Sequence, residues 1–94
     1  MKNITINGHD YELLKDYRDV FDLAEVTDKL TDYFEEYDYI VGDWAYGKLR
    51  LKGFYDSKNK KANNINNFND VDNYLKEFCA NDCKHFIIKK INWS

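Results

Sequence analysis

The chain has 94 residues, which is enough for one domain near the lower end of what a single hydrophobic core can stabilise. Apolar residues make up 44% of it and aromatic residues 17%, and two cysteines are too few for a disulfide scaffold. No run of about 18 apolar residues could cross a bilayer and no signal-peptide pattern follows Met1, so we expect a single cytoplasmic domain over residues 1–94.

The charge is distributed unevenly along the chain, although the net charge is only −3. Residues 1–43 hold 12 acidic and 4 basic residues, a net charge of −8, whereas residues 44–94 hold 5 acidic and 10 basic residues, a net charge of +5. A basic half permits contact with an anionic partner. The alternative is that the two halves attract each other within the fold.

The first 36 residues predict a hairpin followed by a helix. Asn7-Gly8 is the strongest two-residue turn signal, and it would place Ile6 opposite His9. Over residues 20–36, apolar side chains recur at helical spacing, which predicts the first helix. The opposite face of this helix is acidic and is most simply solvated; it carries Asp22, Glu25, Asp28, Asp32, Glu35 and Glu36.

The rest of the chain predicts a second hairpin, a helix and a last strand. Strands are expected at 39–43 and 48–55, joined by a four-residue loop at 44–47. A polar, flexible loop at 56–69 is expected after the second of these strands. A second helix at 70–80 and a strand at 85–91 follow. The order ββαββαβ predicts an α+β domain. Because a helix separates the fourth and fifth strands, we expect a mixed five-stranded sheet with both helices mainly on one face.

Three stretches of this sequence resemble one known family. The stretches "NGHDYELLKDYRD", "YDYIVGDWAYGKLRLKGFY" and "YLKEFCANDCKHFIIKK" are similar to the YutD-like proteins of low-GC Gram-positive bacteria, and the resemblance covers most of the chain. The family usually has glycine where this chain has Ala45. The resemblance implies an α+β fold and a bacterial cytosolic setting, and it implies no activity and no cofactor.

The outer face of the second hairpin is the predicted partner surface. With a loop at 44–47, one face of the hairpin is apolar and the other combines rings with cations. A non-enzymatic adaptor could bind a protein or a ribonucleoprotein there, and the alternative is a single-stranded RNA-binding module with bases stacked on the rings. Cross-strand pairs that only stabilise the sheet are the structural alternative. The residues of this predicted surface are Tyr37, Tyr39, Arg50, Lys52, Phe54, Lys58, Lys60 and Lys61.

The loop motif Asp43, Trp44 and Gly47 is interpreted as structural, with Asp43 bonded to the turn or paired with Lys48 and no catalytic residue assigned. Two spacings leave lesser alternatives. Cys79, Cys83 and His85 would be weak metal ligands because zinc needs a fourth, and Cys83 could instead be a reactive thiol. No metal or cofactor is therefore predicted.

Overall fold

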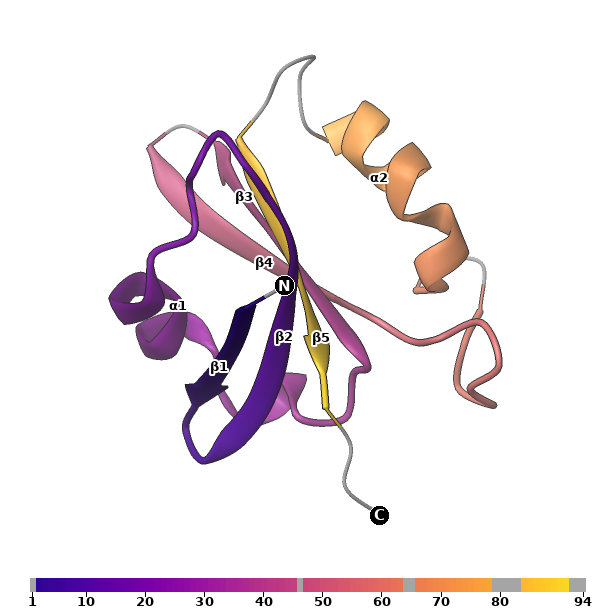
Figure 1. The fold of residues 1–94 in the computed structure, drawn as a ribbon. Helices are drawn as coiled ribbons and strands as arrows, with labels where there is room; N and C mark the ends of the chain where they lie inside the picture. The colour runs from indigo at the N-terminus through magenta and orange to yellow at the C-terminus, as the bar shows by residue number, and fades with distance from the viewer. Residues whose placement is uncertain (1, 46, 64–65, 79–83, 92–94) are drawn as a thin grey trace.

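Five strands form one antiparallel sheet in the order β1-β2-β5-β3-β4 (Figure 1). The structure is a computed structural model that describes residues 2–45, 47–63, 66–78 and 84–91. The Cα radius of gyration is 12.6 Å, close to the value of about 12 Å expected for one domain of this length. The elements are β1 (Lys2–Ile6), β2 (His9–Tyr17), α1 (Leu23–Lys29), the 3-10 helix η1 (Asp32–Phe34), β3 (Tyr39–Ala45), β4 (Lys48–Phe54), the 3-10 helix η2 (Phe68–Asp70), α2 (Val71–Phe78) and β5 (His85–Lys90).

The first hairpin forms as its turn sequence predicts. Asn7 and Gly8 both have positive φ, 52° and 82°, and Ile6 lies opposite His9. β2 continues to Tyr17, beyond Leu13, where its pairing with β1 ends. Its register against β5 shifts at a bulge between Leu13 and Lys15. This extension carries the end of β2 alongside the start of β5.

The predicted mixed sheet is wrong, because every neighbouring pair of strands is antiparallel. β4 and β5 do run in the same direction, as a helical connection between them favours. However, β3 lies between them, and β5 pairs with β2 on one side and β3 on the other. The last strand in the chain is therefore the centre of the sheet, which agrees with the apolar character of Phe86, Ile87 and Ile88.

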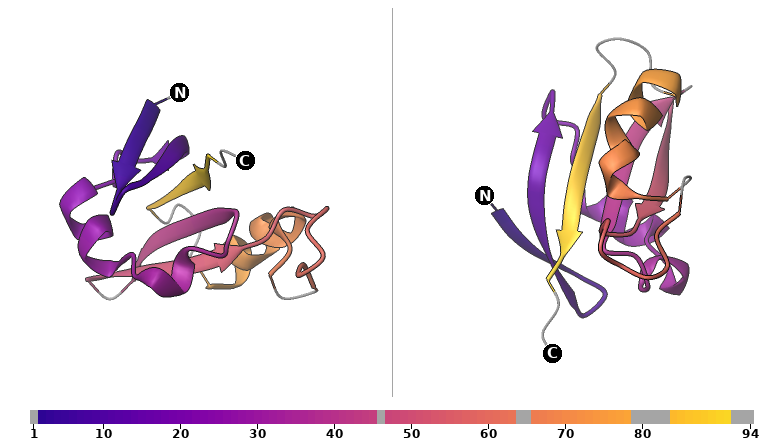
Figure 2. Two further views of the ribbon diagram at one scale, coloured as in Figure 1. Left: turned by 90° about the horizontal axis from the view of Figure 1, so that it is seen from below. Right: turned by 90° about the vertical axis from the view of Figure 1, so that its right-hand side faces the viewer.

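The two helices pack on opposite faces, not mainly on one face as predicted (Figures 1 and 2). Val26 and Leu30 belong to a core that includes Ile40, and α2 contributes Val71 to a second core that includes Val41. Ile40 and Val41 are neighbours on β3 and point to opposite sides of the sheet. The helical periods show which residues of a helix are buried but not which face of the sheet receives them.

The first helix is shorter than the predicted span of 20–36. It begins after Asp22, whose carboxylate accepts from the backbone N–H groups of Ala24 and Glu25. Leu30 and Thr31 are extended, and the Leu30 carbonyl accepts from Asn7 Nδ2 at 2.8 Å instead of continuing the helix. A separate turn, η1, follows.

The register of the second hairpin differs from the prediction by two residues. β3 continues to Ala45 and β4 begins at Lys48, so Asp43 lies opposite Arg50 rather than Lys48. A shift of two leaves every side chain of the two strands on its predicted face. Gly47 has φ 74°, in agreement with the left-handed conformation expected of it.

The chain after β4 is held by backbone contacts to the end of that strand. The N–H of Tyr55 donates to the Asn66 carbonyl at 2.7 Å, and the N–H of Phe68 donates to the Tyr55 carbonyl at 2.9 Å. Asn67 caps η2 through its side chain. α2 then lies within the predicted span of 70–80 and packs on the β3–β4 side of the sheet. The flexibility of the polar loop stays a prediction.

Candidate functional site: a polar row across the sheet

The α2-facing side of the sheet carries a row of polar side chains across four adjacent strands. Tyr17 of β2 lies opposite His85 of β5, which itself lies opposite Asp43 of β3. Asp43 in turn lies opposite Arg50 of β4. Opposite residues of antiparallel strands share a face at Cα separations of about 4.5–5.5 Å, so these four side chains form one line, which we call the polar row.

The Asp43–Arg50 pair is a two-bonded ion pair at the β4 end of the polar row. Arg50 Nε donates to Asp43 Oδ1 at 3.1 Å, and Arg50 Nη2 donates to Asp43 Oδ2 at 2.6 Å. Asp43 is 1% exposed, whereas the Arg50 side chain is 41% exposed. Both carboxylate oxygens are engaged by one guanidinium, which is the strongest geometry available to such a pair. At this end of the polar row, both oxygens of the Asp43 carboxylate are therefore occupied by Arg50.

Tyr74 of α2 lies within electrostatic reach of this ion pair. Its ring meets the Phe54 ring edge-on, with centroids 5.5 Å apart. Burial and the negative charge of Asp43 raise the pKa of the Tyr74 hydroxyl, while Arg50 acts in the opposite direction. Tyr74 therefore lies close to the buried carboxylate and stays protonated at neutral pH.

The other end of the row combines stacked rings with exposed cations. The Tyr17 and His85 rings are stacked, with centroids 5.2 Å apart and an interplanar angle of 26°. Arg18 Cζ lies 5.5 Å from the centroid of the Tyr17 ring and Lys15 Nζ lies 6.0 Å from it. Cations over a tyrosine face are attracted by its quadrupole. Both cationic residues are exposed.

The turn that follows β2 has an unusual backbone. Arg18 and Asp19 have φ values of 68° and 54°, and for a residue as bulky as arginine this is an outlier. Asp16 holds the turn, because its Oδ1 accepts from the backbone N–H groups of Val20 at 2.8 Å and Phe21 at 2.9 Å. Such backbone strain persists only when its surroundings fix it, and it concentrates at functional sites.

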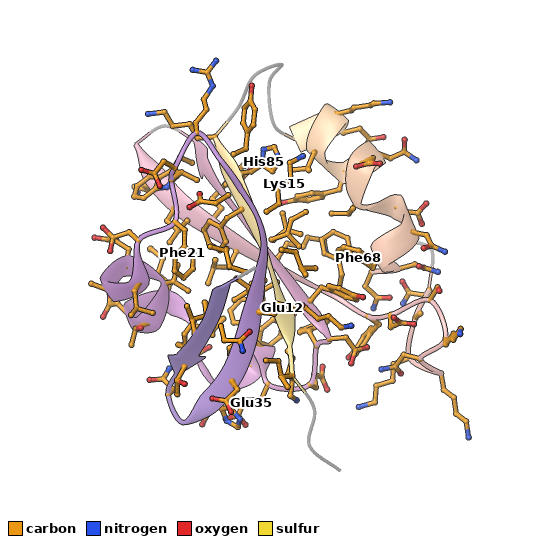
Figure 3. The ribbon with its side chains drawn as sticks, viewed as in Figure 1. Glu12, Lys15, Phe21, Glu35, Phe68 and His85 are labelled. Atoms are coloured by element: carbon orange, nitrogen blue, oxygen red, sulfur yellow. The ribbon has the colours of Figure 1, made fainter. Side chains whose placement is uncertain are left out.

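The aromatic platform predicted on the second hairpin is not exposed. Phe54 is 0% exposed and contacts Tyr74, and Tyr39 is 8% exposed and stacks on Phe68 with centroids 3.7 Å apart. Tyr37 packs against the other core, on the α1 side of the sheet. The expectation of an outward ring surface is therefore wrong, because α2 and η2 pack on the face that carries Tyr39 and Phe54. Figure 3 labels Phe68, the residue of η2 that stacks on Tyr39. Bases cannot stack on rings buried in this way.

Four of the predicted cations are exposed and Lys52 is half-buried, and together they do not form one cluster with those rings. Lys52 lies beside the core on the α2 side of the sheet, with its Nζ 5.4 Å from the Phe54 ring centroid. Lys58, Lys60 and Lys61 are exposed on the polar loop, and Lys61 Nζ is 3.5 Å from Glu36 Oε2. Arg50 is engaged with Asp43. Their role in partner binding stays a prediction.

The structure describes the loop motif residues Asp43, Trp44 and Gly47, but it describes only one of the three weak metal candidates. Trp44 packs against the α1-side core, and its Nε1 is buried without an acceptor among the described residues. Cys79 and Cys83 lie outside the described residues, so only His85 of that group can be placed. Within residues 2–45, 47–63, 66–78 and 84–91, no three His, Cys, Asp or Glu side chains come together as a metal site would require.

Sequence reasoning missed Tyr17 and Tyr74 as neighbours of the motif residues. The signal for Tyr17 was its place in "LKDYRD", where a ring stands between cations. Tyr17 lies opposite His85 only because β5 pairs with β2, and the local periodicity of the sequence does not encode that pairing. Tyr74 belongs to the apolar side of the predicted helix at 70–80, and it comes close to Asp43 because that side of the helix packs on the face of the sheet that carries Asp43.

The family of this chain follows from comparison with known proteins. A model of the YutD-like family, described as "Putative antitoxin YutD-like", matches residues 5–89. The chain is 40% identical over 88 residues to "Putative antitoxin YutD" of Bacillus subtilis (strain 168), and the match covers 94% of this chain and 97% of that protein. It therefore belongs to the YutD-like family, as its motifs indicate.

A solved structure shows the same fold. The solution NMR structure of protein yutD from B. subtilis matches this chain with a TM-score of 0.81 and 38% sequence identity. The match covers 98% of this chain and 84% of that one. The α+β class predicted from the sequence is confirmed. None of the helices in the described residues has the length and apolar content needed to cross a membrane.

Proposed function

We propose that this chain is a non-enzymatic binding domain that acts as an antitoxin, binding a protein partner and blocking its effect. The name of the B. subtilis relative supports the role. The chemistry of the polar row supports a binding function, because its buried carboxylate has both oxygens bonded to Arg50. Such a closed pair stabilises a fold and offers no group to a substrate.

The observation that carries this proposal is an exposed surface on α1 and η1. Leu23 of α1 is 47% exposed and Tyr33 of η1 is 66% exposed, and these are the large apolar side chains that the described part of the chain leaves open to solvent. We call this segment, residues 22–36, the α1–η1 surface. Tyrosine is enriched among the residues that dominate the binding energy of protein interfaces, and a polar rim typically surrounds such residues, so Tyr33 is the expected centre of this surface.

The charge of the α1–η1 surface defines the partner's chemistry. Lys29 is its one basic residue, and its acidic residues are all exposed: Asp22, Glu25, Asp28, Asp32, Glu35 and Glu36. A complementary partner presents a basic surface with a pocket for a tyrosine. Opposed potentials raise the association rate and exclude acidic competitors. This surface replaces the outer face of residues 37–55 as the proposed contact, since the rings of that face are buried.

The antitoxin role is tested by growth. The chain is purified with its bound partner from its own host, and the partner is then expressed alone and together with the chain. We expect the partner alone to arrest growth and co-expression to restore it. If no partner that co-purifies is toxic, the chain is not an antitoxin.

The contact surface is tested with matched charge reversals. Asp28→Lys with Asp32→Lys should abolish rescue and weaken complex formation at least tenfold. The control reverses two exposed acids of α2, Asp72→Lys with Glu77→Lys, and should leave both unchanged. Equal loss in the two double variants would show that overall charge, not the α1–η1 surface, governs binding.

A further inference from the structure

A second surface, of opposite charge, lies at the β2 end of the polar row. We infer that it binds single-stranded nucleic acid, holding phosphates with its exposed cations. We call it the β2-end surface, and it consists of Lys15, Tyr17, Arg18, Lys84 and His85. This inference goes beyond the antitoxin role, and it uses none of the residues of the α1–η1 surface.

The sheet topology brings these residues together from two distant parts of the chain. β2 ends where β5 begins, so Tyr17 lies opposite His85, and Lys15 lies opposite Ile87 on the same pair of strands. Lys84 immediately precedes β5, and its carbonyl accepts from the Trp44 N–H at 3.3 Å, which fixes the backbone there. Figure 3 shows Lys15 and His85 at the same end of the sheet. Lys15, Arg18 and Lys84 are all exposed.

The cations are positioned by the fold before any ligand arrives. Asp16 secures the turn through two backbone hydrogen bonds, and the left-handed conformation of Arg18 places its guanidinium over the Tyr17 ring. The Tyr17 ring also stacks on the His85 ring. Preorganised donors lose less conformational entropy on binding than mobile ones. The strained Arg18 backbone is thus accounted for by where it directs the side chain.

The combination of groups favours nucleic acid over an acidic protein. Single strands are held by cations that meet the phosphates and by planar groups on which bases stack without sequence preference. Guanidinium planes serve this purpose as well as rings do, and Arg18 lies over a ring here. The carboxylates that would oppose phosphates are partly engaged internally: Asp16 accepts from backbone N–H groups and Asp43 pairs with Arg50. Asp19 is exposed beside Arg18 and opposes binding.

Binding is measured by fluorescence anisotropy with a labelled oligouridylate of about 20 nucleotides, in a salt series starting near 50 mM. If three cations meet phosphates, the logarithm of the affinity should fall with the logarithm of the salt concentration with a slope of about −2, since each contact to a single strand contributes roughly −0.7. Lys15→Gln with Arg18→Gln should weaken binding at least tenfold and flatten the slope to about −0.7. Asp19→Asn should tighten binding.

Two controls distinguish binding at the β2-end surface from nonspecific electrostatic attraction. Lys58→Gln with Lys60→Gln removes two exposed cations from the polar loop, at a different place in the fold, and should change the affinity less than twofold (Figure 1). Polyglutamate should displace the oligonucleotide only weakly. The inference is overturned if wild-type protein does not bind the oligouridylate, if both double variants lose affinity equally, or if polyglutamate competes as well as unlabelled oligouridylate. Circular dichroism confirms that each variant is folded.

Discussion

Asp43 and Arg50 face each other directly across β3 and β4, and the buried carboxylate has both its oxygens bonded to the one guanidinium. A carboxylate that is 1% exposed needs this partner, because desolvation strongly opposes an isolated buried charge. The pair is thus a structural requirement of the sheet, and it ties the sequence motif around Asp43 to the strand that follows it.

Arg50→Ala is expected to destabilise the domain by about 1–3 kcal/mol, less than the roughly 3–5 kcal/mol of a fully buried pair because Arg50 is partly hydrated. Lys52→Ala should cost less than about 0.5 kcal/mol, since Lys52 is bonded to no carboxylate in the described contacts. Urea unfolding of the two variants measures the difference. Equal effects would show that the ion pair contributes nothing beyond a surface charge.

Gly42→Ala is expected to destabilise the domain by about 1–3 kcal/mol through overpacking. A Cβ at Gly42 would overlap the Phe86 ring, which is itself fully buried. Gly47→Ala provides the comparison, because a Cβ there meets open space and only the positive φ is penalised, at about 1–2 kcal/mol. Gly42→Ala with Phe86→Leu should recover part of the loss, and failure to recover any would contradict the overlap.

Leu30→Ala should cost about 2–5 kcal/mol, because Leu30 is buried in the α1-side core. Asp28→Ala, two residues earlier on an exposed face, should change stability by less than about 0.5 kcal/mol. Thermal melting followed by circular dichroism distinguishes them. Similar melting temperatures for the two variants would mean that α1 presents a different face to the sheet.

Stability should fall as the pH rises from about 10 to about 12. Burial, together with a hydrogen bond to Glu36, raises the pKa of Tyr55 to about 12, and a hydrogen bond with Tyr33 raises the pKa of Tyr37. In the unfolded chain these phenols ionise near 10, so the unfolded state loses protons first and is favoured as the pH rises.

Tyr55→Phe isolates this contribution from the lysines that titrate in the same range. The stability difference between wild type and Tyr55→Phe should be constant below pH 10 and should change in favour of the variant between pH 10 and 12. Urea unfolding at each pH provides the measurement. A difference that does not vary with pH would show that Tyr55 ionises normally in the folded protein.

Local patterns predicted the strands well because each is encoded by adjacent residues. The Asn7-Gly8 turn fixed its own register, and the alternation of residues 39–54 placed each side chain on the right face even though the loop was two residues too long. The position of β5 between two hairpins was not predictable in this way, because strand order depends on long-range packing.

The candidate site was predicted only in part for the same reason. Asp43, Arg50 and His85 stood out from the sequence, but their alignment in one row depends on the neighbours of β5. The outer face of the hairpin was wrongly predicted to be open to solvent, because the hairpin sequence does not encode that α2 packs on that face. These two errors in the site therefore concern how elements meet, not which elements form.

The central position of β5 determines when the sheet can be completed as the chain folds during its synthesis. The two hairpins are local and can form as they leave the ribosome, but they share no strand pairing with each other until β5 is inserted between them. Until that moment both inner strands are unpaired edges, which are the surfaces that aggregate or recruit chaperones. Residues 85–90 thus complete the whole sheet at once, and loss of that short segment by proteolysis would dismantle the domain rather than shorten it.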